Sequence, residues 1–450
     1  MEFGEFFKGK KVTVMGLGLL GRGIGDAAYI AESGAAEVIV TDRKSAEELK
    51  DSVTKLKHFS NVTFVLGEHR LEDFEGRDIV LVAAGVPMDS EYVARARIAS
   101  ARVVQSAALF AELSGIPVVG ITGTRGKSTT THMIYHTLCQ TFDGSILLGG
   151  NVRGLSNLQL LKQVTEDSIA VMELDSWQLQ GFGWAKISPH VAVFTNFMED
   201  HLNYYTAGGR TKEEAMQLYF EDKANIFKYQ NDHDTLVTTP EVFAWARKLD
   251  KVTLSQEVVL ADDSIIPEDA KLSMPGEHNR LNAALAYKAL EALGLSEEEI
   301  FAGLASFPGV EGRLQYMGEI NDVKIYNDNN ATTPQAVIMG MKAVGSSDDK
   351  NVIWLGGGAK KDIDTTELLA TIPQYCKKVV LLTGTGTDTI KDLIDCEVVE
   401  GLEVAVKAGL AVGEPGDVLL FSPGFASFGL YKNEYERNDL FMEIINSYQE

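Results

Sequence analysis

The stretch that decides the fold of this chain is Val118-Val119-Gly120-Ile121-Thr122-Gly123-Thr124-Arg125-Gly126-Lys127-Ser128-Thr129-Thr130. Its first residues form an apolar run of strand character, and a helical stretch follows from Thr131 to Leu138. Between them lies a Gly-x-x-Gly-Lys-Ser turn, whose backbone N–H groups, Lys charge, Ser hydroxyl and helix N-terminus suit nucleotide phosphates and Mg²⁺. Glycine is needed because a Cβ would block the close backbone approach and the positive φ. The predicted phosphate-binding residues are Gly123, Thr124, Arg125, Gly126, Lys127, Ser128 and Thr129.

The alternative for this stretch is an ordinary Gly-rich turn between a strand and a helix. The usual phosphate-loop pattern has Gly at the position of Ile121, so the match is incomplete. The strand before the turn, the helix after it and Lys-Ser at the junction together favour the phosphate loop.

Composition restricts what the rest of the chain can do. With 450 residues, 45% of them hydrophobic, the chain is expected to form about three domains. It has no apolar run of about 18 residues and no signal-peptide pattern, and its 3 cysteines have neither metal-site nor disulfide spacing. The net charge of −23 argues against a nucleic-acid-binding surface. We expect a cytoplasmic monomer that binds no nucleic acid and does not insert into a membrane.

The first predicted α/β unit covers residues 1–105. A strand over 12–15 leads into Gly16-Leu17-Gly18-Leu19-Leu20-Gly21, a helix over 24–32 follows, and the next strand, 37–40, ends at Thr41-Asp42-Arg43. This order is typical of a dinucleotide-type βαβ unit, with Asp42 where a ribose-binding carboxylate would lie. A later strand, 79–82, ends in a loop with Gly85, for which an ordinary turn is the alternative. The unit is expected to bind a phosphorylated nucleotide or nucleotide sugar.

The second predicted unit, residues 106–310, adds polar residues at strand ends beside the phosphate loop. Glu173 closes an apolar strand, where a carboxylate is placed to coordinate Mg²⁺, although an isolated Glu there is more often a surface residue. A strand over 191–196 leads to Glu199-Asp200-His201, and a lone His is likewise more often structural. His278 and Asn282 lie four residues apart at a helix start, which suits either an adenine clasp or a simple cap.

The third predicted unit, residues 311–450, is a second open α/β sheet. Strands over 323–326, 351–355, 378–382 and 417–421 each lead into a polar or Gly-rich loop, and a helix is predicted between Lys361 and Gln374. Ligands of such sheets bind at the carboxyl ends of the strands.

In this order, the motifs resemble those of the Mur ligases of peptidoglycan synthesis. The matching residues include Gly16-Leu17-Gly18, the phosphate loop, Gly149-Gly150-Asn151, Glu173, Thr195-Asn196 with Glu199-Asp200-His201, Lys223, His278-Asn279, Arg313, Asn327-Asp328, Gly356-Gly357, Lys360, Ser422-Pro423, Ala426-Ser427 and Arg437. The resemblance implies an N-terminal Rossmann-like domain, a central P-loop-type ATPase sheet and a C-terminal Rossmann-like open sheet. It also implies ATP-dependent ligation of D-glutamate to UDP-N-acetylmuramoyl-L-alanine through an acyl phosphate.

The resemblance also implies residue roles. Lys127 would bind the ATP phosphates, Ser128 and Glu173 one Mg²⁺, and His201 and Lys223 a second, with Lys223 carbamylated because an ammonium has no acceptor. Without the resemblance, Lys223 would be taken for a solvated helix residue. Asn279, Arg313 and Asp328 would contact adenine, phosphate and ribose. The uridine diphosphate and muramoyl contacts would come from Gly18, Leu19, Leu20, Asp42, Arg43, Gly85 and Asn151, and the amino-acid contacts from Thr332, Lys360 and Ser427.

The sequence departs from the family pattern at several positions, most of them in the third unit. Asn330 stands where a Lys is usual, Gly312 where a His is usual and Glu434 where an aromatic residue is usual, and Asp175-Ser176-Trp177 replaces Ser-Ser-Phe. These differences leave open another acceptor such as L-glutamate. A folylpolyglutamate-synthetase-like ligase would lack the unit around Gly16. A nicotinamide-dependent dehydrogenase would leave Lys127 and Ser128 unexplained, and a nucleotide sensor would not need Glu173, His201 and Lys223 together.

Overall fold

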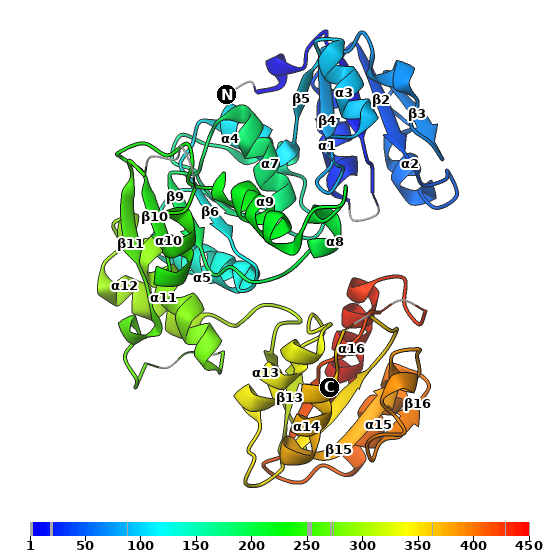
Figure 1. Ribbon diagram of the computed structural model, residues 1–450, viewed down its shortest axis with the longest axis vertical. Coiled ribbons are helices and arrows are strands. Elements are labelled where there is room, and N and C mark those ends of the chain that lie inside the picture. The colour runs from blue at the N-terminus through cyan, green and yellow to red at the C-terminus, as the bar shows by residue number, and fades with distance from the viewer. Residues whose placement is uncertain are drawn as a thin grey trace. The chain divides into compact units, whose positions relative to one another are not determined.

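The computed structural model describes residues 3–18, 21–87, 89–249, 254–270, 272, 274–361, 363–427 and 429–449. The chain forms two compact units, one of Met1–Ile265 with Asn282–Gly303 and one of Ile266–Leu281 with Leu304–Glu450 (Figure 1). It contains three sheets with helices packed against them, which confirms the predicted α/β class. The boundaries at residues 105 and 310 stay predictions.

The first sheet is fully parallel, with the strand order β3-β2-β1-β4-β5. This is the order expected of a doubly wound nucleotide-binding sheet. Its central strands β2, β1 and β4 are largely buried and rich in Val, Ile and Leu, as sheets covered on both faces require. The elements are η1 (Phe3–Phe6), β1 (Lys11–Met15), α1 (Arg22–Glu32), β2 (Glu37–Asp42), α2 (Lys50–Leu56), β3 (Val62–Leu66), η2 (Leu71–Phe74), β4 (Ile79–Val82), α3 (Glu91–Ile98) and β5 (Arg102–Val104).

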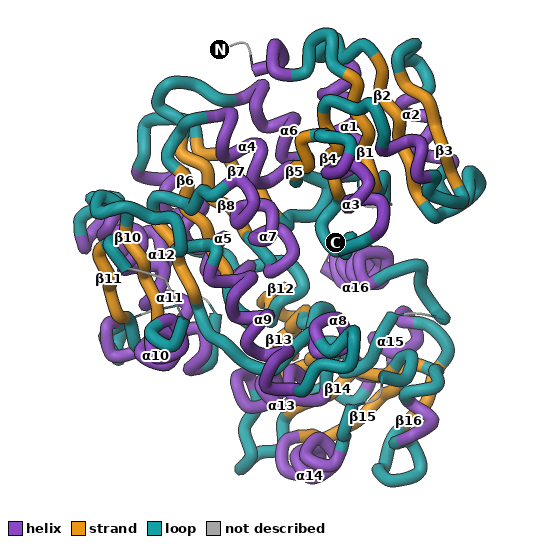
Figure 2. The backbone as a smooth tube through the Cα atoms, turned by 45° about the horizontal axis from the view of Figure 1, so that its top comes forward, coloured by secondary structure: helices purple, strands orange, loops and turns teal. Residues whose placement is uncertain are grey.

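The second sheet belongs to the same compact unit and is also parallel, in the order β11-β10-β9-β6-β8-β7. Helices α4, α7 and α9 pack against one another beside it, and α5 packs on β6, β7 and β8 (Figures 1 and 2). Because β9, β6 and β8 are neighbours, the loops at their carboxyl ends meet. The elements are α4 (Ser106–Ser114), β6 (Val118–Thr122), α5 (Lys127–Thr141), β7 (Ile146–Gly150), α6 (Asn157–Leu160), η3 (Leu161–Gln163), β8 (Ile169–Glu173), α7 (Ser176–Ala185), β9 (Val191–Phe194), α8 (Leu202–Tyr205), α9 (Lys212–Ala224), β10 (Thr235–Thr238), α10 (Pro240–Ala246), β11 (Glu257–Leu260), η4 (Asp263–Ile265), α11 (Glu277–Ala292) and α12 (Glu297–Ser306).

The third sheet, in the other compact unit, has the order β12-β13-β17-β14-β15-β16, with β12 antiparallel at one edge. One apolar cluster joins the sheet to α15 and α16, and another joins it to α13 and α14, so both faces are covered. The elements are β12 (Gln315–Ile320), β13 (Val323–Asn327), α13 (Pro334–Val344), β14 (Val352–Gly357), α14 (Thr366–Tyr375), β15 (Cys376–Leu382), η5 (Thr387–Thr389), β16 (Glu397–Val399), α15 (Leu402–Ala411), β17 (Val418–Phe421) and α16 (Glu434–Gln449).

The helix predicted from Lys361 is shorter than expected. It begins at Thr366, whose backbone N–H donates to Asp364 Oδ1 over 2.9 Å. Lys361 instead belongs to the loop after β14, where its ammonium is bound to Thr332. A contact distant in sequence therefore overrides the local helical pattern. Among the described helices, none has the length and apolar character needed to cross a membrane.

Candidate active site

The phosphate-loop stretch forms a strand, a turn and a helix, as its pattern predicts. β6 ends at Thr122, Gly123 and Gly126 have φ of 149° and 81°, and α5 begins at Lys127. The loop after β9 fixes the turn through Asn196. Thr124 N–H donates to Asn196 O over 3.0 Å, and Arg125 N–H donates to Asn196 Oδ1 over 2.9 Å. Lys127 Nζ lies 3.0 Å from Gly123 O, which places its charge over the loop. The N-terminus of α5 adds further attraction for an anion.

Ser128 and Glu173 meet beside this loop. Ser128 is in the first turn of α5 and Glu173 is the last residue of β8, and both are buried. Ser128 Oγ donates a hydrogen bond of 2.6 Å to Glu173 Oε2. A hydroxyl and a carboxylate next to a phosphate loop are the donor set that suits Mg²⁺ bound also by phosphate oxygens. Among the described residues, no three His, Cys, Asp or Glu side chains are arranged so that they could hold a metal ion by themselves, so a metal here would also need ligands of other kinds.

Lys223 is buried beneath the phosphate loop. Its side chain comes from the last turn of α9 and is 1% exposed. The ammonium donates to Gly123 O over 2.8 Å and to Thr122 Oγ1 over 3.3 Å, and it lies 5.0 Å from the centre of the Tyr219 ring. Among the described residues no carboxylate forms an ion pair with it. Burial, and then the nearby Lys127 charge, hold the pKa of Lys223 well below its usual value. The solvated lysine suggested by the sequence alone is thereby excluded.

His201 lies in the loop that follows β9, beyond the carboxyl end of that strand of the second sheet. It has a φ of 54° at the start of α8, and its ring is 4.9 Å from that of Trp177. Its side chain is half-exposed, and Nε2 is 3.8 Å from Asp200 Oδ2. Burial lowers the pKa of His201, Asp200 raises it in part, and the charges of Lys127 and Lys223 lower it further. A neutral imidazole is the form that can ligate a metal ion.

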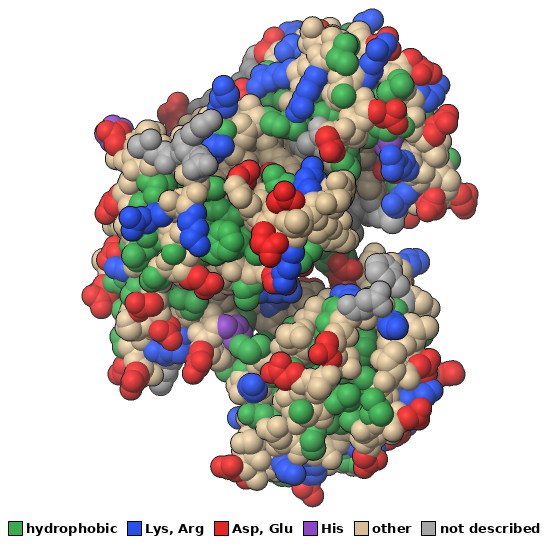
Figure 3. Space-filling model, viewed as in Figure 1, with side chains coloured by type: hydrophobic (Ala, Val, Ile, Leu, Met, Phe, Trp, Pro, Cys, Tyr) green, Lys and Arg blue, Asp and Glu red, His purple; other side chains and the backbone are tan. Residues whose placement is uncertain are grey.

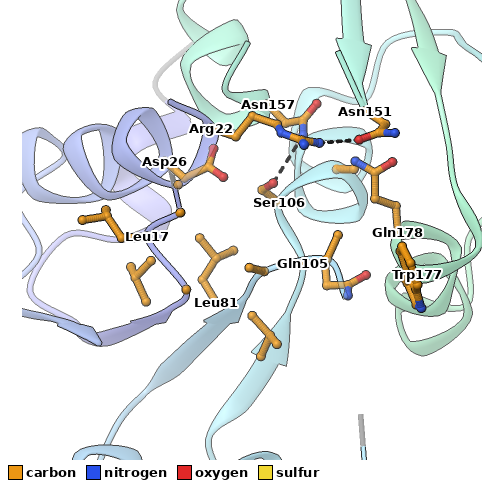
Figure 4. Close-up of a pocket in the computed structure, with 18 of the residues that line it drawn as sticks. Leu17, Arg22, Asp26, Leu81, Gln105, Ser106, Asn151, Asn157, Trp177 and Gln178 are labelled. Carbon is orange, nitrogen blue, oxygen red and sulfur yellow. Dashed lines mark hydrogen bonds between the residues drawn. The ribbon is translucent and has the colours of Figure 1, made fainter. Parts of the chain in front are cut away.

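A cavity of about 410 Å³ opens between the first and second sheets of the same unit. Its lining includes residues from α1, from the loops after β1, β4 and β7, and from the start of α7. Figure 4 shows Arg22 and Asn151 reaching toward one another from opposite sides, and Arg22 Nη1 donates to Asn151 Oδ1 over 2.5 Å. Trp177 and Gln178 border the cavity on the side of the second sheet (Figure 4). The cavity is roomy enough for a substantial ligand and offers both polar and aromatic contacts.

The predicted UDP-substrate residues are distributed unevenly around this cavity. Gly18, Asp42 and Asn151 line it, whereas Arg43 and Gly85 follow β2 and β4 and are not among its described lining residues. Leu19 and Leu20 lie outside the described residues.

The Asp42 carboxylate accepts three hydrogen bonds from backbone N–H groups. Its Oδ2 accepts from Leu17 N–H at 2.9 Å and from Gly18 N–H at 3.0 Å, and its Oδ1 accepts from Lys44 N–H at 2.9 Å. The carboxylate thus holds the Gly-rich turn in place at the edge of the cavity that it lines.

The predicted nucleotide residues Asn279, Arg313 and Asp328 belong to the other compact unit. Asn279 is buried near the start of α11 and donates to Pro275 O over 2.8 Å, while Arg313 is exposed. Asp328 follows β13 and accepts from Ser422 Oγ at 2.9 Å and from Leu314 N–H at 3.1 Å. Burial raises the pKa of Asp328 to about 7, with those hydrogen bonds acting in the opposite direction.

The predicted amino-acid residues Thr332, Lys360 and Ser427 come from the loops that follow β13, β14 and β17. These strands are neighbours, and backbone hydrogen bonds join their loops. Gly424 N–H donates to Ala331 O over 2.8 Å, and Ala359 and Ala426 exchange two hydrogen bonds of 2.9 and 3.1 Å. The structure therefore brings the three predicted positions to one edge of the third sheet. These loops, from 330–332, 358–361 and 424–427, are called the acceptor loops below.

Several site residues were not singled out from the sequence. Arg22, Gln105 and Ser106 line the cavity, and Lys361 contacts Thr332 in the acceptor loops. None of them belongs to a recognisable local motif, because each is brought to its site by contacts with residues far away in the chain. Two lysines in succession at 360 and 361 are the one signal that could have drawn attention to this loop.

Comparisons with known proteins identify the family of this chain. The family description "Mur ligase middle domain" matches residues 121–290, and "Mur ligase, glutamate ligase domain" matches residues 312–425. A UDP-N-acetylmuramoylalanine–D-glutamate ligase from Roseiflexus sp. (strain RS-1) is 32% identical, covering 98% of this chain and 99% of its own. The enzyme of that name from Clostridioides difficile (strain 630) is 30% identical, with coverage of 98% and 99%.

The fold is shared with a solved Mur enzyme. The MurF ligase from Thermotoga maritima, solved in complex with ADP, superimposes with a TM-score of 0.59 at 18% identity, covering 99% of this chain and 97% of its own. A phosphate loop, a strand-end carboxylate, a buried lysine and a third sheet with acceptor loops thus occur together with full-length sequence similarity. The chain belongs to the Mur ligase family of ATP-dependent ligases.

Proposed function

We propose that this chain joins D-glutamate to UDP-N-acetylmuramoyl-L-alanine at the expense of ATP, as a step in the synthesis of peptidoglycan precursors. Similarity along the whole chain to ligases named for that reaction supports the substrate pair. The observation that carries the proposal is the arrangement around the phosphate loop, where Lys127, the Ser128–Glu173 pair and the buried Lys223 lie together.

The chemistry requires charge neutralisation more than a protein nucleophile. The carboxylate of the UDP-linked substrate attacks the γ-phosphorus of ATP, which forms an acyl phosphate and releases ADP. The amine of D-glutamate then attacks the acyl carbon, and the tetrahedral intermediate loses phosphate and a proton to leave an amide. Lys127 and the amide N–H groups of the loop stabilise the charge that develops on the transferred phosphoryl group. The cavity between the first two sheets is the proposed site for the UDP-linked substrate.

Two magnesium sites belong to the proposal. Ser128 and Glu173 would hold one ion, and the 2.6 Å hydrogen bond between their oxygens supports this pairing. His201 and a carbamylated Lys223 would serve the other. Carbamylation joins the neutral lysine nitrogen to the carbon of CO₂ with loss of one proton, and it supplies the oxygens that an amine lacks. The burial of Lys223 next to the loop, without an ionic partner among the described residues, favours this modification. When bound, the ions would screen the repulsion between phosphates and carboxylate.

The acceptor loops are the proposed site for D-glutamate, with Thr332, Lys360 and Ser427 as its contacts. Hydroxyl and cationic donors suit the two carboxylates of this amino acid. Asn330 and Glu434, which depart from the family pattern, favour one alternative, a different amino-acid acceptor. The remaining predicted contacts, Asn279, Arg313 and Asp328 for ATP and Gly18, Asp42, Arg43, Gly85 and Asn151 for the UDP substrate, are kept in this proposal.

The proposed partners are small molecules, the protein is proposed to act as a monomer, and the reaction is placed in the cytoplasm, where ATP and UDP-linked precursors are available. On the face shown in Figure 3, basic and acidic side chains are interspersed. A nucleic-acid-binding surface would instead need basic side chains gathered together.

Isotope transfer tests the proposed reaction. UDP-N-acetylmuramoyl-L-alanine labelled with ¹⁸O in its carboxylate is incubated with ATP, Mg²⁺ and D-glutamate. The ¹⁸O content of the released inorganic phosphate is then measured by mass spectrometry. An acyl phosphate carries one carboxylate oxygen into phosphate, so one ¹⁸O per phosphate is expected. Unlabelled phosphate released together with the amide product would contradict activation of the carboxylate by phosphorylation.

A further inference from the structure

The third sheet carries a cation that the family pattern does not include. We propose that Lys361 binds a carboxylate of the acceptor amino acid together with Thr332, and so replaces the lysine that the pattern has at position 330. This inference rests on the proposed function, because it concerns the acceptor loops of that reaction. It adds a specificity-determining residue that lies outside the recognised motifs.

Asn330 does not supply the missing cation. Its side chain is neutral, and its Nδ2 donates to Glu311 O over 3.3 Å. The same nitrogen would lie 3.1 Å from a Cβ added at Gly312, a position that has a φ of 69°. Two of the departures from the family pattern, Asn330 and Gly312, are therefore neighbours. The asparagine side chain is directed toward the space that a larger residue at 312 would need.

Lys361 brings an ammonium to Thr332, which lies two residues after Asn330 in the same loop. Its Nζ donates to Thr332 O over 2.9 Å and to Thr332 Oγ1 over 3.0 Å, and the side chain is half-buried. Since Thr332 Oγ1 accepts from the ammonium, its own O–H proton must point elsewhere, where it can be donated to an anion. A hydroxyl polarised by a cation is a good donor to a carboxylate. Lys361 and Thr332 together form an anion-accepting pair that Asn330 cannot provide.

The surrounding loops fix where this pair lies. Gly424 N–H is bonded to Ala331 O, next to Thr332, and Ala359 is paired with Ala426, next to Ser427. Lys360 N–H donates to Thr385 Oγ1 over 3.0 Å, so the backbone is also held on the side of β15. Lys361 is thus anchored in the loops that carry all three predicted amino-acid contacts. The late start of α14, at Thr366, leaves residue 361 in the loop and directed at Thr332.

The ligand class follows from the charges. Lys360 and Lys361 add two positive charges to loops that otherwise present hydroxyl groups and backbone amides. Such a site favours an amino acid with two carboxylates over one with a neutral side chain, because a second carboxylate can accept charge-assisted hydrogen bonds that a neutral group makes more weakly.

Steady-state kinetics with Lys361→Gln tests this assignment, using the full chain with ATP, Mg²⁺ and UDP-N-acetylmuramoyl-L-alanine. The KM for D-glutamate is expected to rise about 10- to 100-fold, the range for loss of a charge-assisted hydrogen bond, with the KM values for ATP and the UDP substrate nearly unchanged. Lys361→Arg keeps the charge and should stay within a few-fold of the parent. Lys407→Gln, an exposed residue of α15, is the matched control.

A second substitution that restores the lost cation gives a more specific test. Asn330→Lys introduced into Lys361→Gln returns a cation to the position used by the family and should recover most of the lost affinity for D-glutamate. A parental KM in Lys361→Gln would overturn the inference while leaving the proposed function intact. A Lys361→Gln defect that Lys361→Arg shares and Asn330→Lys does not relieve would also overturn it, because it would indicate a structural role. Absence of turnover with D-glutamate in the parent enzyme would contradict the proposed function and the inference together.

Discussion

The phosphate loop of one compact unit and the acceptor loops of the other are both built at the carboxyl ends of parallel strands, yet their functional residues match the family pattern to different extents. Around the phosphate loop, Lys127, Ser128, Glu173, His201 and Lys223 match the family pattern, and the departures there are Asp175 and Trp177, shortly after β8. Ser128, Glu173 and Lys223 are buried in mutual or backbone contacts. In the acceptor loops, Asn330 departs from the pattern and Lys361 lies beside Thr332. Phosphate binding depends on backbone geometry that few residues satisfy, whereas a carboxylate can be bound by a cation arriving from several positions.

The largest effect is expected from the phosphate loop. Lys127→Ala removes the charge that lies over the turn, so kcat should fall by about 10²–10³-fold or more, the range for loss of one electrostatic contact to a transition state. The measurement is ADP release together with amide formation, and Lys55→Ala, an exposed lysine of α2, is the control. Turnover close to that of the parent would remove Lys127 from the reaction.

Lys223 tests whether the buried amine is modified. Lys223→Ala should lower activity by roughly 10²-fold, in line with loss of a residue that orients a metal ligand set, and high bicarbonate should not restore it. With ¹³CO₂, the parent protein should show a carbamate ¹³C resonance that Lys223→Ala lacks. An identical carbamate signal in both proteins, or an active variant, would exclude carbamylation at this position.

Two glycine variants separate the effect of a steric contact in the phosphate loop on ATP binding from the effect of backbone strain on stability. A Cβ at Gly126 would overlap the Asn282 side chain, and the residue has a φ of 81°, whereas Gly115 has a φ of 62° with open space around it. Both Ala variants carry a conformational cost of about 1–2 kcal/mol in unfolding free energy. Gly126→Ala alone should also raise the KM for ATP, by about 10-fold or more, since the loop must shift. Equal KM values for ATP would show that the contact has no bearing on nucleotide binding.

The smallest effect concerns the pH dependence of stability in the compact unit that contains the third sheet. The pKa of Asp328 is raised to about 7 in the folded protein, above its usual value of 3.8, so the folded state holds the proton more tightly. The contribution of Asp328 to the free energy of unfolding is therefore full below about pH 4 and is lost as the pH rises toward 7. Asp328→Asn should remove this dependence, of the order of 1–3 kcal/mol, in urea unfolding measured from pH 4 to 8. Parallel stability profiles for the two proteins would show that burial does not shift this group.

Local patterns were sufficient for much of the architecture. The strand, turn and helix from Val118 to Leu138 and the position of Glu173 at the end of β8 follow from residue type and spacing alone. The edge strands β12 and β16 did not stand out, because exposed strands lack a continuous apolar run. The helix start near residue 361 was misplaced because a tertiary contact with Thr332 decides that loop.

The site was predictable where one loop carries the chemistry and less so where distant segments meet. Lys223 is 100 residues from Gly123 in the chain, and its burial beneath the loop could not be known from the sequence around it. Arg22 and Asn151 meet across 129 residues, and their contact depends on how the first two sheets pack. The family resemblance suggested Lys223 and Asn151 but not Arg22, and only the packed structure shows which partners these residues have.

The most direct test of the central claim is mass spectrometry of the product formed from UDP-N-acetylmuramoyl-L-alanine, ATP and Mg²⁺ with D- and L-amino acids supplied one at a time. We expect a single product, whose mass corresponds to the addition of D-glutamate, and none with L-glutamate or D-glutamine. Product formed with a different amino acid and not with D-glutamate would contradict the proposed acceptor.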